Sequence, residues 1–169
     1  MARSQCHPPD QVADRTIVAA DGSEALEFAK ILRLRRQNAA SVRLYEEAFR
    51  LAPELAENPL PGDRYDAACA AVQTCVLEGE DGKKTALSGE ALRWIREDLS
   101  AWNRRLENGN ALLRASAVRA LKRWRTESQL AAVRDAAAVS GLSAMTEDGW
   151  RALWQDVDAA LEHAATRGD

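Results

Sequence analysis

The fold is decided by the stretch SVRLYEEAFRLAP, which occupies residues 41–53. Its apolar members fall at helical spacings of three, three and one: Val42, Tyr45, Ala48 and Phe49. This spacing places one apolar stripe along an α-helix, and Pro53 stops the helix because proline lacks the backbone N–H that the next turn needs. The sequence therefore predicts an amphipathic helix over residues 39–52 that packs its stripe against a neighbouring element.

A second amphipathic helix precedes this stretch. It begins at Asp21-Gly22-Ser23-Glu24, where the side chain of Asp21 or Ser23 can accept a hydrogen bond from a first-turn amide, and it ends near Gln37-Asn38. Its wide apolar face comprises Leu26, Phe28, Ala29, Ile31 and Leu32. The two helices are predicted to form an antiparallel hairpin.

The next part of the chain follows the same periodicity. Pro61-Gly62-Asp63 opens a third helix, and the charged segment 79–84 predicts a flexible solvent loop after it. The third helix carries the stripe Tyr65, Ala68, Cys69 and Val72. The fourth helix closes at Asn108-Gly109 and has the cleanest stripe: Leu92, Ile95, Leu99, Trp102 and Leu106. Trp94 falls off this stripe, so it either packs on a neighbouring helix or faces a partner.

Three C-terminal segments complete the predicted fold. Asn110 caps a fifth helix, a short helical piece follows at 130–139, and the last helix starts at Thr146. The stripes of the two long helices are Leu113, Ala117, Leu121 and Trp124, then Trp150, Trp154, Val157 and Leu161. Since β-branched residues never cluster with period two, we predict an all-α protein of about six or seven helices, closed by a C-terminal capping helix.

Composition limits the class of protein. The chain has 169 residues, 46% of them apolar, and a formal net charge of −3. We expect a flexible lead-in over 1–20 and a single helical domain over 21–166. The small negative charge gives no global basic field that would attract nucleic acid or an anionic membrane. No segment has the length of a membrane span or a signal peptide, so we expect a cytoplasmic protein, in which the three cysteines are reduced and buried.

The first hairpin resembles a tetratricopeptide (TPR) repeat, a helical hairpin of about 34 residues with small residues at the helix contacts and a terminal proline. With Gly22 as the first position, the matches are Ala29, Ser41, Tyr45, Ala48 and Pro53. A degenerate second unit starts at Gly62. The resemblance implies a TPR-like stack, with repeats at about 22–55 and 62–107 and C-terminal helices over 110–166. Helical hairpins of this kind bind other proteins.

Four blocks of sequence resemble a narrower family. They are LYEEAF at 44–49, DRYDAACAA at 63–71, LRWIREDL at 92–99 and the residues 130–135. In this order they are similar to the TPR-containing C-terminal region of bacterial serine/threonine protein kinases, over roughly residues 25–162. The resemblance implies a noncatalytic regulatory or scaffolding region. Asp66 departs from it, because asparagine is expected at that position.

The residues do not predict an enzyme. The chain contains no G-x-G-x-x-G loop, no strand lysine with a helix glutamate partner, and no H-R-D or D-F-G sequence. His7 and His163 lie in different predicted segments, so they give no basis for a metal site or a catalytic base. Adjacent acidic residues such as Glu97 and Asp98 diverge by roughly 100° on a helix, so they are expected to be solvated. No metal or cofactor is implied.

A protein partner is expected on the first helices of the two repeats, which line the groove of a TPR array. The predicted contact residues are Lys30, Arg33, Leu34, Asp66 and Gln73. Lys30 and Arg33 lie three apart on one helical face and could jointly hold a carboxylate of a partner, although a solvated edge would show the same pattern. The double charge reversal Lys30→Glu with Arg33→Glu is predicted to abolish binding without unfolding the chain.

An alternative function is nucleic-acid binding by the basic helix 114–125. Its five basic residues are Arg114, Arg119, Lys122, Arg123 and Arg125. They could neutralise phosphates, and Trp124 could stack on a base. A helix with arginines outside and tryptophan inside is also the ordinary way to cover a core.

Overall fold

Every regular element of the described residues is helical, which confirms the predicted all-α class. The computed structural model describes residues 18–78, 81–134 and 144–166. The elements, in chain order, are α1 (Gly22–Leu34), α2 (Asn38–Leu51), α3 (Glu54–Glu57), α4 (Asp63–Glu78), α5 (Asp81–Asn108), α6 (Ala111–Thr126), the 3₁₀ turn η2 (Ser128–Leu130), α7 (Ala131–Arg134) and α8 (Ala144–Thr166).

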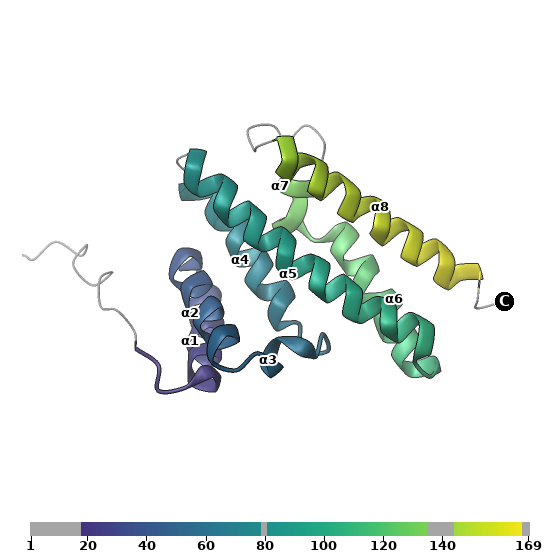
Figure 1. Ribbon diagram of the computed structural model, residues 1–169, viewed down its shortest axis with the longest axis horizontal. Helices are drawn as coiled ribbons and strands as arrows, with labels where there is room; N and C mark the ends of the chain where they lie inside the picture. Colours follow the sequence, from purple (N-terminus) through teal and green to yellow (C-terminus); the bar gives the residue numbers. More distant parts are fainter. Residues whose placement is uncertain (1–17, 79–80, 135–143, 167–169) are drawn as a thin grey trace, which may run out of the picture.

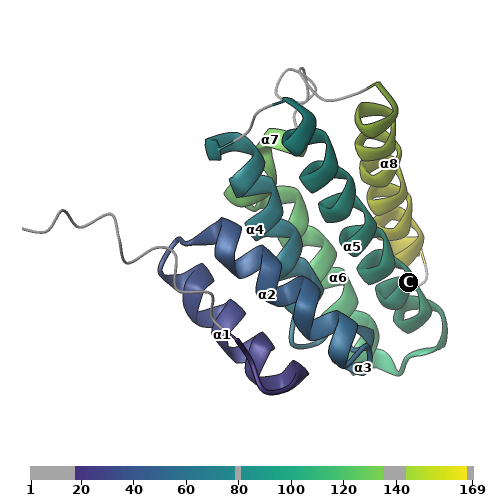
Figure 2. The ribbon, with the colours of Figure 1, turned by 60° about the vertical axis from the view of Figure 1, so that its left-hand side comes forward.

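The long helices are arranged in a row, with α1 and α8 at opposite ends (Figure 1). Helix α1 packs on α2 and α4 packs on α5, so each of these consecutive pairs forms a hairpin. Helix α2 also contacts α4, and α5 contacts both α6 and α8. Figure 2 shows the same order from another side, with α4 between the α1/α2 pair and α6. The C-terminal helix therefore covers one end of the row, as a capping helix would.

Small residues allow α1 and α2 to approach closely. Ala29 and Ala48 are fully buried, and the hydroxyl of Ser41 donates a hydrogen bond of 2.8 Å to the carbonyl oxygen of Ala29. At the start of α1, a Cβ on Gly22 would lie only 2.7 Å from the Cβ of Ala52. The small residues that predicted the hairpin thus lie at its contact, whereas Ile31, predicted on the apolar face of the first helix, is exposed. Helix α2 ends at Leu51, just before the predicted proline stop.

The tryptophans form much of the core. All five are buried, and Trp94, whose surroundings the sequence left open, is 1% exposed and packs edge-on against Phe49 with ring centroids 5.9 Å apart. The indole of Trp150 donates to the hydroxyl of Ser88 at 2.8 Å. Trp94 therefore packs on a neighbouring helix, α2, through its contact with Phe49. The thiols of Cys69 and Cys75 are free and buried, as predicted, whereas Cys6 lies outside the described residues.

The structure differs from the prediction at three places. The loop predicted for 79–84 is wrong from Asp81 onward, where α5 begins, and residues 79–80 lie outside the described residues. Helix α3 was not predicted, and it follows Pro53, a residue that fits the first turn of a helix. The piece predicted for 130–139 is η2 followed by α7, which is described only to Arg134. The predicted lead-in lies outside the described residues except for 18–20.

Candidate partner-binding surfaces

The structure brings four of the five predicted contact residues together where α1, α4 and η2 meet. The Nζ of Lys30 lies 3.1 Å from Oδ1 of Asp63, and Nη2 of Arg33 lies 3.1 Å from Oδ1 of Asp66. Further contacts involve Gln129 of η2, whose side-chain oxygen accepts from Arg33 at 3.0 Å and whose carbonyl oxygen accepts from Gln73 at 3.0 Å. We call these residues the α1/α4 network: Lys30, Arg33, Asp63, Asp66, Gln73 and Gln129.

The α1/α4 network pairs its charges within the chain. Two basic and two acidic side chains form two ion pairs, and burial raises the pKa of Asp66 while the nearby Arg33 opposes that rise. Gln129, which sequence reasoning missed, fills part of the expected groove from within the molecule. The network is therefore close to neutral rather than the open basic clamp for a carboxylate that the sequence suggested.

Leu34, the fifth predicted residue, lies at the end of α1 and points into solvent. Its side chain is 81% exposed, and Ile31, three residues earlier on the same helix, is 44% exposed. Residues three apart on a helix are neighbours on its surface. We call this pair, next to Lys30, the α1 apolar patch.

The buried position of Asp63 changes the expectation for the double charge reversal. Asp63 is buried, so Lys30→Glu would place a second carboxylate beside it in a region of low dielectric. Arg33→Glu would do the same beside Asp66. We therefore expect the double variant to lose stability, and a loss of binding by it would not identify a contact surface.

On the basic helix, now α6, Trp124 is turned into the core. It is 2% exposed and stacks on Tyr65 with ring centroids 5.7 Å apart, so it offers no face to a base. Arg125 pairs with Asp158 at 3.1 Å and Arg123 with Glu127 at 3.6 Å. Arg119 and Lys122 are exposed, and contact of this helix with phosphates remains a prediction.

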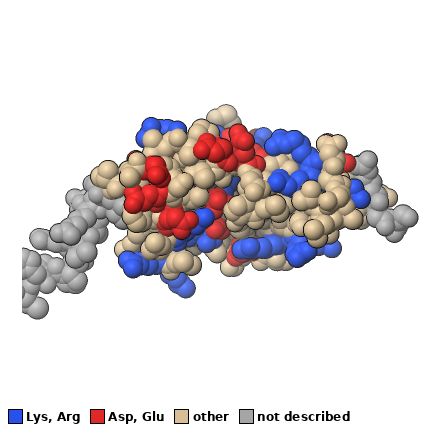
Figure 3. Space-filling model, turned by 90° about the horizontal axis from the view of Figure 1, so that it is seen from below, with Lys and Arg blue, Asp and Glu red and all other residues tan. Residues whose placement is uncertain are grey.

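Basic side chains gather near this end of the molecule. On the face drawn in Figure 3, Lys and Arg form two bands over the right half, the end that holds α6 and α8 in Figure 1. Asp and Glu gather closer to the middle and the left of that face. On that face, basic side chains thus outnumber acidic ones at the end that holds α6 and α8, although further basic side chains lie at the left (Figure 3).

Asp98 contradicts the expectation that the acidic pair on α5 is solvated. It is 1% exposed, and among the described residues no donor meets either carboxylate oxygen in good hydrogen-bonding geometry, although the side chain of Trp102 is near enough to lower its pKa. Burial raises the pKa of Asp98 to about 7, although the charge of Arg64 acts in the opposite direction. The two acidic residues differ because successive side chains diverge by roughly 100° around a helix: one faces outward and the other faces the core.

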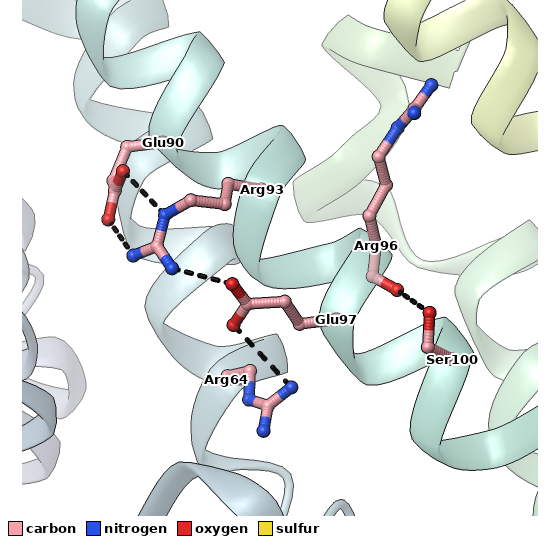
Figure 4. A network of polar contacts seen from close by, with 6 residues as sticks. All are labelled: Arg64, Glu90, Arg93, Arg96, Glu97 and Ser100. Carbon is pink, nitrogen blue, oxygen red and sulfur yellow. Dashed lines mark hydrogen bonds and ion pairs between the residues drawn. The ribbon is translucent and has the colours of Figure 1, made fainter. Parts of the chain in front are cut away.

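The outward member, Glu97, belongs to a surface network. The guanidinium of Arg93 bridges Glu90 and Glu97, and Glu97 also lies 3.6 Å from Nη1 of Arg64 (Figure 4). Glu97 therefore engages Arg64, whose charge also lowers the pKa of Asp98, and the buried carboxylate forms no ion pair with any described residue.

Asp98 is one of the residues that line a cavity of about 270 Å³. We call it the α4–α6 cavity, since it lies between the loop Pro59–Gly62 and the helices α4, α5 and α6. Its walls include the rings of Tyr65, Trp102 and Trp124, and it also contacts Arg119 and Arg123. A buried carboxylate, aromatic walls and arginines are thus combined in one hollow.

The described residues contain no group of three or more His, Cys, Asp or Glu side chains arranged to hold a metal ion. Within those residues, no helix has the length and apolar character needed to cross a membrane. His163 is exposed on α8, while His7 lies outside the described part of the chain. Comparison of the chain with protein-family models, with curated proteins and with solved structures finds no match.

Proposed function

We propose that the chain is a noncatalytic protein-interaction module of the cytoplasm, built from TPR-like helical hairpins. The α1/α2 and α4/α5 pairs support this proposal, because two consecutive hairpins pack through α2 and α4, as stacked repeats do. The first pair also buries the small residues of the repeat pattern at its contact. The resemblance to the C-terminal region of bacterial serine/threonine kinases extends the proposal to a regulatory or scaffolding role.

The partner contact that we propose is centred on the α1 apolar patch. Exposed Leu34 and Ile31 offer apolar area, and burying such area drives association. The side chain of Lys30 is 35% exposed despite its ion pair, so a partner carboxylate can still reach it. Arg33, Asp66 and Gln73 lie beside the patch, and their mutual contacts hold the surface in one conformation. Exposed Leu34 next to the α1/α4 network is the observation that carries the proposal.

A surface variant tests this contact without disturbing the network. Leu34→Asp changes an exposed side chain and should leave the melting temperature unchanged. Met145→Asp on α8 is the matched control, because Met145 is 84% exposed. We expect a protein retained from lysate of the source organism, through a high-salt wash, to be lost with Leu34→Asp and kept with Met145→Asp. Equal retention by both variants would refute the assignment, and nucleic acid that elutes with salt in place of protein would favour α6.

A further inference from the structure

The α4–α6 cavity is the place where the structure leaves both a hollow and an unmet hydrogen-bonding group. Its volume of about 270 Å³ lies just below the range of roughly 300 to 1,000 Å³ that is usual for small-molecule sites. One large side chain of a partner fits such a space better than a nucleotide cofactor does. The aromatic walls contributed by Trp102 and Trp124 suit an apolar ring.

The carboxylate of Asp98 favours a bound ring that carries a hydrogen-bond donor. A buried carboxylate without a good hydrogen bond is costly. Among the described residues no donor meets either oxygen of Asp98 in good hydrogen-bonding geometry, and the side chain whose hydrogen bonding lowers its pKa, Trp102, is itself a wall of the cavity. A ring that carries an N–H or O–H supplies the missing donor, whereas a phenylalanine ring does not. Tryptophan combines apolar area with one donor.

The positive charges of Arg119 and Arg123 at the cavity favour acidic residues on either side of the bound ring. Within the described part of the chain, Arg119 has no ion-pair partner, and Arg123 pairs only with Glu127, at 3.6 Å. Lys122 adds an exposed positive charge on the same helix. Carboxylates at either side of the inserted ring would meet these cations. A nucleic acid is a poorer occupant, because its phosphates would approach the carboxylate of Asp98, which lines the cavity.

We propose that the α4–α6 cavity binds a tryptophan side chain from an acidic segment of a partner protein, with the indole N–H donated to Asp98 and the acidic residues held by Arg119 and Arg123. This site is separate from the α1 apolar patch, so the two proposals can fail independently.

The experiment measures fluorescence anisotropy of a fluorescein-labelled peptide, EDEWEDE, titrated with the full chain at about 50 mM salt. Three probes serve as controls: EDEFEDE lacks the donor, KRKWKRK reverses the charge, and a single-stranded oligonucleotide has the same net charge. We expect the phenylalanine peptide to bind about fivefold to tenfold more weakly and the basic peptide not to bind. Equal affinity for the two acidic peptides, no binding of EDEWEDE, or tighter binding of the oligonucleotide would overturn the proposal.

Variants of the chain locate the site. Arg119→Glu should weaken binding of EDEWEDE about tenfold, whereas Arg43→Glu, the same charge change at an exposed position of α2, should leave it within about twofold. Asp98→Leu should bind both acidic peptides with equal affinity, since the acceptor is gone. An equal loss with Arg43→Glu would show a diffuse charge effect, and a preference for tryptophan that survives Asp98→Leu would exclude the carboxylate; either result contradicts the proposal. The peptide comparison on the unaltered chain keeps the test valid if one variant fails to fold.

Discussion

Replacing Asp98 by asparagine is expected to stabilise the fold, and to do so only where the carboxyl group is ionised. Its pKa in the folded chain is about 7, against an ordinary value of 3.8. Between these values the folded state keeps a proton that the unfolded state has released, so the stability of the natural chain falls as pH rises from about 4 to 7. At 1.36 kcal/mol for each pH unit, the cost reaches about 4 kcal/mol at pH 7 and above.

Asparagine carries no charge at any of these pH values, so the stability of the variant does not fall through ionisation at position 98. The free energy of unfolding of Asp98→Asn should exceed that of the natural chain by an amount close to zero near pH 4 that grows to about 4 kcal/mol by pH 8. Glu46 and Asp66, whose pKa values burial also raises, are present in both proteins and cancel in the difference.

Urea unfolding followed by circular dichroism, at each pH from 4 to 8, measures this difference. The slope of free energy against urea should be the same for both proteins, which shows that the variant keeps the fold. A variant that is less stable at pH 8, or a difference that does not change with pH, would refute the view that Asp98 is a desolvated carboxyl without a partner.

Three further outcomes follow from the packing. Trp94→Ala should lower the free energy of unfolding by about 3 to 5 kcal/mol in urea titrations, and a loss below about 1 kcal/mol would show that the ring is not in the core. Gly22→Val should lower the melting temperature, because even its Cβ would meet that of Ala52 at 2.7 Å; an unchanged melting curve would contradict this close contact. Cys69 and Cys75, whose pKa values burial raises, should resist iodoacetamide until the chain is unfolded, and rapid alkylation of both under native conditions, followed by mass spectrometry, would show that they are accessible.

Helix positions could be predicted because their signals are local. The stripe from Leu92 to Leu106 lies on one chain segment, and its period predicts four core residues of α5, Ile95, Leu99, Trp102 and Leu106. The stop at Pro53 and the cap at Asp21, which accepts a hydrogen bond of 2.9 Å from the amide of Glu24, also depend only on neighbouring residues. Such features do not require knowledge of the tertiary structure.

The surroundings of the candidate site residues could not be predicted, because they depend on contacts between distant segments. Gln129 reaches Arg33, 96 residues away in sequence, and nothing near Gln129 in the chain indicates that contact. In the sequence, Glu97 and Asp98 are adjacent acidic residues with nothing to distinguish them. In the structure, Glu97 pairs with Arg64 of another helix, whereas Asp98 is buried. The spacing of Lys30 and Arg33 predicts that they share a helical face, but it does not reveal that their acidic partners lie on α4.

The most direct test of the proposed interaction function is site-specific photo-crosslinking in cells of the source organism. A photoreactive amino acid replaces Leu34 in one chain and Met145 in another, two positions of similar exposure at 81% and 84%. A partner on the α1 apolar patch predicts a discrete crosslinked protein adduct from position 34 that is absent from position 145. The same adducts from both positions, or none from position 34, would contradict it.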